Sequence, residues 1–390
     1  MGGGQASVRR LTWAQVSARR MGRQGLTSPL TGAGAADAVT AMCGAHAQVL
    51  SAAELSVGLR LAGATRSDVR AALWGERSLV KTFGPRGTVH LLPTRDLPMW
   101  TGALSALPRP RSPFADEVRL TDAQTELVLA AIADALHDAV LTVDELTAAV
   151  VERAGTWAGD LVMPAFQGTW PRWRQALALA GTRGVLCFGP DRGRNVTYTS
   201  PRRWLPDLVP LQPEVAVAGL LRSYLGAYGP VTDQHLATWL STRPRWAADR
   251  LAGLGSEVER VELEGSVGWQ LAGDDVPAGG RTSVRLLPYF DAYVVACQPR
   301  QRLFRGAAAQ RALAPSGQAG NYPVLLVDGT VAGVWHLRRS GRRATLTVEP
   351  LTRLSARRRR LLDDEAGRLG EVLEVTVSLT VGPVTVAPHA

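Results

Sequence analysis

The chain has 390 residues, of which 46% are hydrophobic, and its formal net charge is +10. This length and apolar content are typical of a globular protein with several modules and a sizeable core. No apolar run is long enough to span a bilayer, and residues 1–5 lack the apolar core of a signal peptide. The composition therefore argues against a membrane-spanning or exported protein.

Almost all of the basic side chains are arginine, and Lys81 is the single lysine. A guanidinium group presents a planar fork of donors that suits phosphate groups and guanine edges. The excess of arginine therefore predicts a polyanionic partner. The same excess is compatible with a charge that serves only solubility, or with a GC-rich genome that favours arginine together with alanine and glycine.

The three cysteines, Cys43, Cys187 and Cys297, lie far apart in apolar contexts. They match neither the spacing of a zinc site nor a disulfide framework. We therefore expect free thiols in a reducing cytoplasm and no metal site.

In chain order, one pattern repeats: a helical stretch, a short capped helix, a longer helix and a β-hairpin. The middle copy is the clearest, because Thr142 followed by Glu145 fits a capping box. Its expected elements are helices over 121–136, from 142 onward and over 173–180, and strands over 185–189 and 196–199. This order is typical of a winged helix-turn-helix motif.

The flanking copies follow the same order with less regularity. The first copy has expected helices over 12–21 and 67–73, a segment around His46 between them, and strands over 79–83 and 88–92. The third copy has expected helices over 220–228, 235–240 and 246–254, and strands over 258–263 and 268–271.

After residue 280 the pattern changes to β-strands with a single helix. The expected strands lie over 284–288, 322–329, 331–336, 344–348 and 375–381, and the expected helix lies over 354–369. Asp328-Gly329 is a signal for a tight hairpin turn. We expect residues 301–320 to form a mobile loop rich in Arg, Ala and Gly.

These elements predict an α+β protein with three tandem winged helix-turn-helix motifs and a small C-terminal β domain. The predicted segments are 8–105, 106–212, 213–280 and 281–390. A repeated winged helix is also compatible with a platform for protein–protein contacts. We favour DNA, because the predicted wings carry Lys81, Arg86, Arg192 and Arg194.

His46 and Gln48 form the most distinctive local feature. They precede Ser51 and Glu54, which fit a second capping box at the start of an apolar helix. Residues two apart project to the same side of an extended backbone. An imidazole and an amide at this spacing can therefore bind the same water molecule through hydrogen bonds. The alternatives are a helix cap, a buried polar pair or solvated surface, because short motifs are often matched by chance.

At three further places the chain resembles the winged-helix DNA glycosylases typified by AlkZ and YcaQ. Residues 82–93 (TFGPRGTVHLLP) resemble the family's Arg-Gly-Thr-x-His-Leu stretch. Residues 287–293 (LPYFDAY) resemble its Leu-Pro-x-Phe-Asp-x-Tyr segment, and residues 323–329 with 333–335 resemble its C-terminal hairpin. The resemblance covers nearly the whole chain.

The resemblance implies three tandem winged helices and a β domain curved around duplex DNA. The family's catalytic tripeptide is usually Gln-x-Gln or Gln-x-Asp; Gln48 matches its last residue, and His46 departs from its first. A His-x-Gln form resembles members linked to self-resistance against bulky DNA-alkylating antibiotics. The implied activity is hydrolysis of the N-glycosidic bond of N7-alkylguanine, including bulky adducts or crosslinks.

The chemistry of this reaction fits His46 and Gln48. Alkylation at guanine N7 makes the purine a good leaving group, so the enzyme needs a placed water more than a general acid. The Gln48 carbonyl accepts a hydrogen bond from this water, and neutral His46 accepts its proton. A lyase would need an amine, and Lys81 is the single lysine, so we expect a monofunctional hydrolase without metal or cofactor.

Other residues are expected to contact DNA or to support the site. The expected DNA contacts are Lys81, Arg86, Thr88, His90, Arg192 and Arg194, although Thr88 and His90 also suit a role inside the hairpin. Asp291 either orients an active-site group or pairs with an arginine. Trp170 and Trp173 either stack on DNA or belong to the core.

The expected partner is duplex DNA that bears alkylated guanine, with no membrane association. We expect a monomeric, cytoplasmic bacterial protein that associates with the nucleoid. The alternative function is a non-catalytic winged-helix regulator that binds a drug or an operator. Such a regulator would show sequence preference and would release no base.

Overall fold

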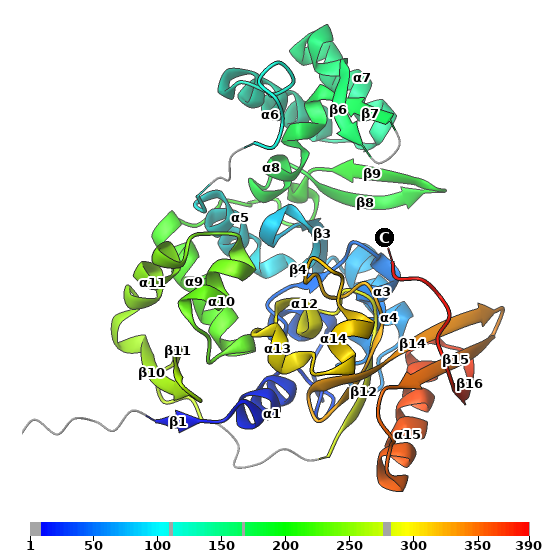
Figure 1. Ribbon diagram of the computed structural model, residues 1–390. Helices are drawn as coiled ribbons and strands as arrows, with labels where there is room; N and C mark the ends of the chain where they lie inside the picture. The colour runs from blue at the N-terminus through cyan, green and yellow to red at the C-terminus, as the bar shows by residue number, and fades with distance from the viewer. Residues whose placement is uncertain (1–8, 109–111, 166–167, 276–281, 390) are drawn as a thin grey trace, which may run out of the picture. The chain divides into compact units, whose positions relative to one another are not determined.

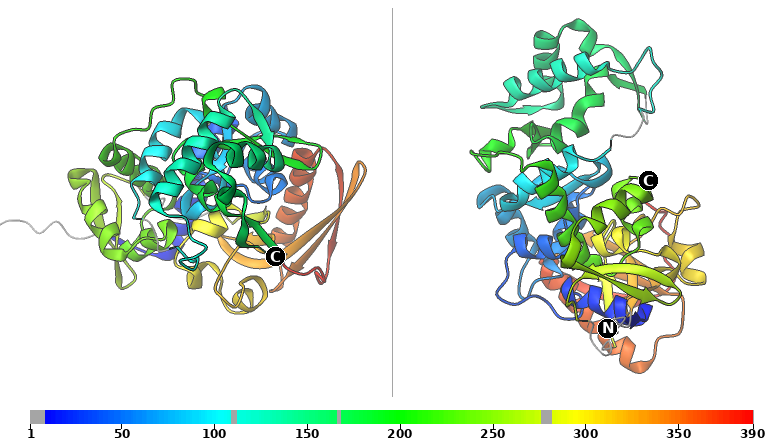
Figure 2. Two further views of the ribbon diagram at one scale, coloured as in Figure 1. Left: turned by 90° about the horizontal axis from the view of Figure 1, so that it is seen from above. Right: turned by 90° about the vertical axis from the view of Figure 1, so that its left-hand side faces the viewer.

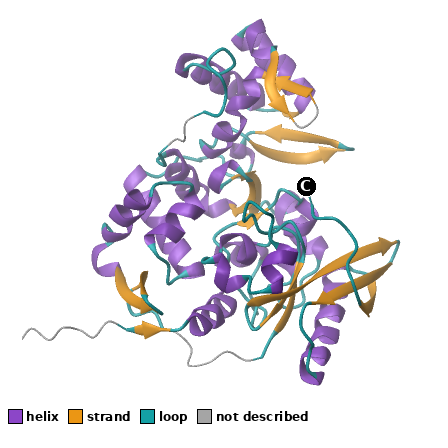
Figure 3. Cartoon of the chain, in the orientation of Figure 1, coloured by secondary structure: helices purple, strands orange, loops and turns teal. Residues whose placement is uncertain are grey.

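The computed structural model describes residues 9–108, 112–165, 168–275 and 282–389 (Figure 1). Helices alternate with β-hairpins and one larger sheet, so the predicted α+β class is confirmed (Figure 3). Contacts divide the chain into two compact units. Unit 1 holds the chain up to Ala72 and from Leu221 onward, and unit 2 is Leu73–Leu220. These units do not coincide with the four consecutive segments expected from the sequence.

The first helix of unit 1 packs on a small sheet. Strand β1 (Arg10–Leu11) pairs in parallel with β10 (Val258–Leu263), which is antiparallel to β11 (Ser266–Leu271). Helix α1 (Trp13–Arg23) begins at a capping box between Thr12 and Gln15. A core cluster of Leu11, Trp13, Val16, Val261 and Leu263 joins the helix to the sheet.

The helices of the third predicted copy are present close to their expected positions. They are α9 (Pro213–Tyr228), α10 (Asp233–Leu240) and α11 (Pro244–Ala252). Thr232 caps α10 by accepting a hydrogen bond from the amide of His235. Together with β10 and β11 they reproduce the expected order of helices followed by a hairpin.

The segment around His46 departs from its prediction at one point. It contains α2 (Ala35–Ala41), β2 (Ala45–His46), α3 (Leu50–Gly58) and α4 (Arg66–Arg70), which continues into a π-helical turn at Ala71–Gly75. The predicted capping box of Ser51 and Glu54 is wrong. Helix α3 begins at Leu50, and Val49 occupies its cap without a side-chain hydrogen bond. The buried Glu54 carboxylate instead pairs with Arg66 and with Arg70, the latter at 2.8 Å.

A five-stranded sheet forms the C-terminal part of unit 1. Its order is β12 (Val284–Leu287), β13 (Val324–Val327), β14 (Thr330–Ser340), β15 (Arg343–Pro350) and β16 (Thr376–Val381). Neighbours are antiparallel except β15 and β16. Helix α15 (Ala356–Leu373) contributes Leu362 and Leu369 to a core shared with Leu286, Trp335 and Leu346. Figure 2 shows this helix beside the sheet from two directions.

Connections around this sheet confirm one prediction and correct another. Asp328 and Gly329 both have positive φ and form a two-residue turn between the paired Val327 and Thr330, as the Asp-Gly signal predicts. Residues 301–320 are not one irregular loop. They contain most of α13 (Arg300–Leu303) and all of α14 (Ala307–Ala312), and Arg311 is bound through two hydrogen bonds of 3.0 Å to Glu349.

Unit 2 contains β-hairpins among its helices. The strands are β3 (Leu79–Phe83), β4 (Val89–Pro93), β5 (Val140–Thr142), β6 (Leu161–Ala165), β7 (Gly168–Pro171), β8 (Cys187–Arg192) and β9 (Asn195–Thr199). The helices are α5 (Leu97–Ser105), α6 (Asp122–Leu136), α7 (Val143–Ala154) and α8 (Leu177–Thr182). The capping box of Thr142 and Glu145 is confirmed.

The predicted third helix of the middle copy has two parts. A 3₁₀ segment over Arg172–Ala176 leads into α8, and the hairpin β6–β7, which the sequence did not predict, precedes it. Trp173 is fully buried and belongs to the core. Trp170 is 40% exposed, and the Arg174 guanidinium lies 3.9 Å from its ring centroid.

Hairpins β3–β4 and β8–β9 pack against each other within unit 2. The rings of Phe83 and Phe188 lie 5.4 Å apart, and those of Phe188 and Tyr198 lie 5.1 Å apart. Helix α8 approaches β3 closely, because a Cβ at Gly181 would lie 2.4 Å from the Phe83 ring. Both hairpins that carry the predicted DNA contacts therefore share one aromatic core.

Three further observations concern the cysteines, the potential metal ligands and the length of the helices. All three cysteines are free and buried. Among the described residues, no group of three or more His, Cys, Asp or Glu side chains is placed to hold a metal ion. None of the helices in the described ranges has the length and apolar character needed to cross a bilayer.

A buried ion pair joins distant parts of unit 1. Two guanidinium nitrogens of Arg60, which follows α3, donate to the two carboxylate oxygens of Asp291 at 2.8 Å each. Both side chains are completely buried. The Ser56 hydroxyl and the Tyr293 amide donate to the same carboxylate at 2.6 and 2.9 Å. Asp291 also caps α12 (Ala292–Ala296), so this cluster fastens α3 to α12 across 231 residues of sequence.

We predict that Asp291→Asn lowers the free energy of unfolding by about 3–5 kcal/mol, because Arg60 would remain buried without a counter-charge. Urea unfolding measures this change, with the same slope of the free energy of unfolding against urea concentration in the wild type and the variant. Asp363→Asn is the matched control. Its partner Arg359 lies 3.6 Å away and both side chains are exposed, so a loss below about 1 kcal/mol is expected. Equal losses for the two variants would contradict the prediction.

Candidate functional site

His46 and Gln48 lie in the short segment between α2 and α3. Strand β2 ends at His46, and α3 begins four residues later, at Leu50. Ala45 and Ala47 are buried, His46 is half-buried and Gln48 is exposed. The two alanines therefore belong to the core, whereas His46 and Gln48 are the more accessible residues of the segment.

The imidazole of His46 has an aromatic neighbour. Its ring stacks on Phe290, with centroids 5.1 Å apart and planes inclined by 30°. Phe290 is buried and adopts a left-handed backbone conformation with φ of 53°. Its amide donates to the Gly320 carbonyl at 3.0 Å. One face of the candidate base is therefore covered by a phenyl ring, while Gln48 next to it remains exposed.

Asp291 lies next to Phe290 in sequence but not at the exposed surface. Its carboxylate is bound to Arg60, Ser56 and the Tyr293 amide. Of the two expectations for Asp291, pairing with an arginine describes its contacts. Because both carboxylate oxygens are buried and bound, Asp291 is not placed to accept a proton from water.

The hairpin β3–β4 places three of its four predicted DNA contacts, Arg86, Thr88 and His90, in different environments. Arg86 is exposed at the turn, in a left-handed conformation with φ of 61°. The Thr88 hydroxyl donates to the Pro85 carbonyl at 3.0 Å, and His90 is buried with Nδ1 2.9 Å from the Thr88 carbonyl. Thr88 and His90 therefore fix the shape of the turn that presents Arg86.

A glycine explains how closely this hairpin packs. An added Cβ at Gly84 would lie 2.6 Å from Nδ1 of His90, so a larger residue would displace the imidazole. Lys81, on β3, is half-buried, and its ammonium group lies 4.6 Å from the Phe188 ring centroid. The side chain of Lys81 thus lies against the shared aromatic core of the two hairpins.

The hairpin β8–β9 also places its two predicted DNA contacts, Arg192 and Arg194, in different environments. Arg192 donates to both oxygens of Glu145 at 2.8 and 3.0 Å and to the Val140 carbonyl at 2.6 Å. Hydrogen bonds from the Thr142 amide and from Arg192 lower the pKa of Glu145. Arg194 is exposed in the turn between β8 and β9. Arg192 ties the hairpin to α7, and Arg194 is presented to solvent.

Two functional features of the structure were not predicted from the sequence. Phe290 lies within the LPYFDAY segment, next to the predicted Asp291. Four arginines surround the turn between β14 and β15, and all four are exposed: Arg338, Arg339, Arg342 and Arg343. The run RRSGRR is visible in the sequence and marks a third basic hairpin, in unit 1.

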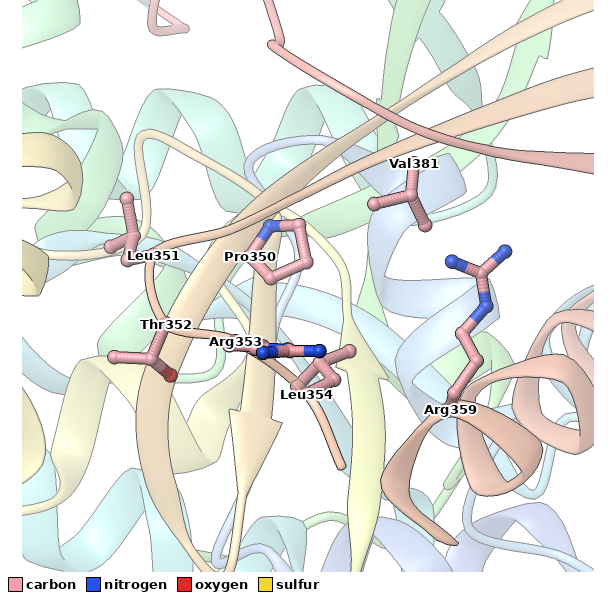
Figure 4. Close-up of a pocket in the computed structure, with 7 residues that line it drawn as sticks. All are labelled: Pro350, Leu351, Thr352, Arg353, Leu354, Arg359 and Val381. Carbon is pink, nitrogen blue, oxygen red and sulfur yellow. The ribbon is translucent and has the colours of Figure 1, made fainter. Parts of the chain in front are cut away.

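A pocket of about 470 Å³ lies elsewhere in unit 1, next to the N-terminal end of α15 (Figure 4). Its lining consists of Pro350, Leu351, Thr352, Arg353, Leu354, Arg359 and Val381. None of the predicted site residues lines it. Apart from the two guanidinium groups and one hydroxyl, its walls are apolar, and we assign it no catalytic role.

Comparison with known proteins identifies relatives of the whole chain. The family described as DNA glycosylase AlkZ-like matches residues 39–372. An interstrand DNA cross-link repair glycosylase of Streptomyces sahachiroi is 32% identical over 359 residues, which are 84% of this chain and 88% of the relative. The solved structure of the Streptomyces sahachiroi DNA glycosylase AlkZ has a TM-score of 0.77 and 28% identity, covering 95% of this chain and 100% of that chain.

The matched residues include the His46 segment, the hairpins β3–β4 and β8–β9 of unit 2 and the Phe290–Asp291 pair. The structural match extends over both compact units. The family resemblance expected from four short motifs is therefore confirmed along most of the chain, and the interpretation as a non-catalytic regulator is not retained. The chain belongs to the AlkZ-like DNA glycosylase family and is an enzyme that acts on N-glycosyl bonds.

Proposed function

We propose that this glycosylase hydrolyses the N-glycosidic bond of N7-alkylguanine in duplex DNA, including bulky antibiotic adducts and interstrand crosslinks. The observation that supports the proposal is that His46 and Gln48 are more accessible than Ala45 and Ala47, the buried residues with which they alternate before α3. Its Streptomyces sahachiroi relative is described as an interstrand cross-link repair glycosylase, which supports crosslinks as substrates. Self-resistance or DNA repair is the corresponding role in the cell.

The proposed reaction divides the chemistry between the substrate and the two side chains. A purine alkylated at N7 carries a positive charge and departs without prior protonation. The enzyme must then place one water against an oxocarbenium-like sugar. The Gln48 carbonyl accepts one hydrogen bond from this water, and neutral His46 accepts its proton as the water attacks C1′. The products are the free base and an abasic site.

The proposed reaction is monofunctional, because the chain has a single lysine and that lysine is engaged within a hairpin. Covalent catalysis through a Schiff base requires an amine that can reach the sugar. The ammonium group of Lys81 lies 4.6 Å from the Phe188 ring centroid. We propose that Lys81 stabilises the hairpin and contacts DNA. We also propose that no residue of this chain cleaves the DNA strand.

The proposed scaffold consists of three winged helices and the C-terminal β domain, and it acts as a monomer in the cytoplasm, on the nucleoid. The basic hairpins supply phosphate contacts in this proposal, with Arg86 and Arg194 at their turns. Thr88, His90 and Arg192 act indirectly, by shaping those turns. The net charge of +10 supports a polyanionic partner.

We predict that the protein converts duplex DNA bearing N7-methylguanine, a bulky N7 adduct or an N7-linked interstrand crosslink into abasic sites. Alkaline cleavage of end-labelled strands after incubation measures the product. An unmodified duplex of the same sequence is the control and should remain intact. Absence of abasic sites on all three substrates would refute the proposed substrate class.

We predict that His46→Ala and Gln48→Ala each slow single-turnover excision by about 10²-fold, the scale of a lost general base or water-positioning group. Because both residues hold one water, the double variant should be little slower than the slower single variant. The wild-type rate should fall at low pH, because a protonated imidazole cannot accept the proton of the water, and His46→Gln should flatten this dependence.

The control for these variants is Gln234→Ala, which removes an exposed amide from α10 of the same unit. It should leave excision, DNA affinity and thermal unfolding unchanged. Wild-type rates for His46→Ala and Gln48→Ala would show that the two side chains only begin a helix and that the chemistry lies elsewhere.

We predict that Arg86→Ala and Arg194→Ala weaken binding to all DNA sequences alike, because phosphate contacts carry no sequence information. Each variant should reduce the slope of log affinity against log salt concentration by about 1. Fluorescence anisotropy at several salt concentrations measures both quantities. Arg153→Ala is the control, since this exposed arginine of α7 pairs with Asp134 at 2.6 Å. A loss confined to one sequence would contradict phosphate contact.

A further inference from the structure

We propose that Phe290 is a positioning residue for His46: its ring holds the imidazole in the orientation from which it accepts the proton of the attacking water. The inference rests on the proposed function of His46. It adds a residue that has no polar side-chain atom and that makes no bond to water or DNA in the proposed reaction.

The geometry of the stack defines what Phe290 can do. The two rings are nearly parallel, at 30°, and their centroids are 5.1 Å apart. Rotation of the imidazole about its Cβ–Cγ bond would drive its edge into the phenyl ring, so the stack restricts this torsion. A base that must meet one water from one direction gains from such restriction, because proton transfer depends on the alignment of donor and acceptor.

The backbone of Phe290 is strained, and the surrounding structure maintains that strain. A bulky residue with φ of 53° is uncommon and persists only where its neighbours fix it. The Gly320 carbonyl accepts the Phe290 amide at 3.0 Å, and a Cβ at Gly320 would lie 2.9 Å from Cδ1 of Phe290. On the other side, the next residue is Asp291, which is locked to Arg60.

Filling the core does not explain this strain. A phenylalanine in an ordinary backbone conformation buries the same ring without the unfavourable φ angle. Here the unusual conformation occurs at the residue whose ring faces the candidate base. Strain of this kind gathers at sites where a side chain must be presented in one direction.

A second histidine also packs on Phe290. The ring of His389 meets Phe290 edge-on, with centroids 5.4 Å apart and an angle of 80°, and it meets Tyr289 at the same distance. His389 is tied to Asn321 by two hydrogen bonds of 2.8 Å, one from its amide and one to its carbonyl. Phe290 therefore contacts two imidazole rings, and the segment that ends in His389 helps to fix its position.

The test compares Phe290→Leu, which removes the ring and keeps an apolar side chain, with Phe290→Tyr, which keeps the ring. Phe290→Leu should slow single-turnover excision of N7-methylguanine by about 10- to 100-fold, the scale of a misplaced catalytic group, with unchanged DNA affinity. Phe290→Tyr should retain most of the wild-type excision rate, because the tyrosine keeps the ring. Phe304→Leu is the control, because Phe304 is another buried phenylalanine of unit 1.

A readout that does not require activity accompanies the rates. The phenyl ring current displaces the NMR signal of the His46 ring proton, so Phe290→Leu should move this signal and Phe304→Leu should not. In the His46→Ala background, Phe290→Leu should cause no further loss of rate, because its effect acts through the imidazole. His389→Ala, which leaves the Phe290 ring in place, should change signal and rate in the same direction but less.

The outcomes separate this inference from the function on which it rests. If wild-type protein releases no N7-alkylguanine, the proposed function fails, and the NMR comparison still decides whether Phe290 orients His46. If wild-type protein is active, an unchanged His46 signal or an unchanged excision rate in folded Phe290→Leu overturns the inference alone. Should that variant unfold, unchanged signal and rate in His389→Ala overturn it instead. Equal losses in Phe290→Leu and Phe304→Leu also overturn it.

Discussion

The buried ion pair of Arg60 and Asp291 determines the geometry of the candidate active site. Burying two charges removes them from water, so such a pair adds little net stability over an apolar contact, while loss of one partner is strongly unfavourable. What the pair provides is a fixed orientation: two parallel hydrogen bonds of 2.8 Å join the end of α3 to the start of α12. His46 precedes the first of these helices and Phe290 precedes the second, so the ion pair joins the two elements that follow the stacked rings.

Exposure divides the candidate residues into those that can meet DNA and those that shape the surface. Arg86 and Arg194 lie at hairpin turns and are exposed, whereas His90 and Arg192 are engaged within their own hairpins or with α7. In these hairpins the backbone packs so closely against side chains that only a glycine fits, as at Gly84. This close packing and the contacts between aromatic rings make the hairpins rigid. Rigid presentation lowers the entropy lost when a long arginine side chain binds a phosphate.

Features set by neighbouring residues were predictable from the sequence. The capping box of Thr142 and Glu145, the Asp328-Gly329 turn and the strands of both basic hairpins follow local rules and are present. The capping box predicted at Ser51 was wrong because the Glu54 carboxylate pairs with two arginines that follow α3. No local sequence pattern indicates these ion pairs. Helix α14 was missed because six residues hold little helical signal without the Arg311–Glu349 contact. Phe290 was missed because its partner lies far away in the chain.

The discontinuity of unit 1 has a consequence for biosynthesis. Unit 2 is one continuous stretch, so all of its internal contacts are available as soon as Leu220 has left the ribosome. The His46 segment emerges much earlier, but the residues that fasten it, Phe290 and Asp291, are translated only after unit 2. During this interval the candidate catalytic segment has no completed core, and its apolar helix α3 is exposed to chaperones and proteases. The contacts that fasten the candidate catalytic segment are thus translated after the hairpins proposed to hold DNA.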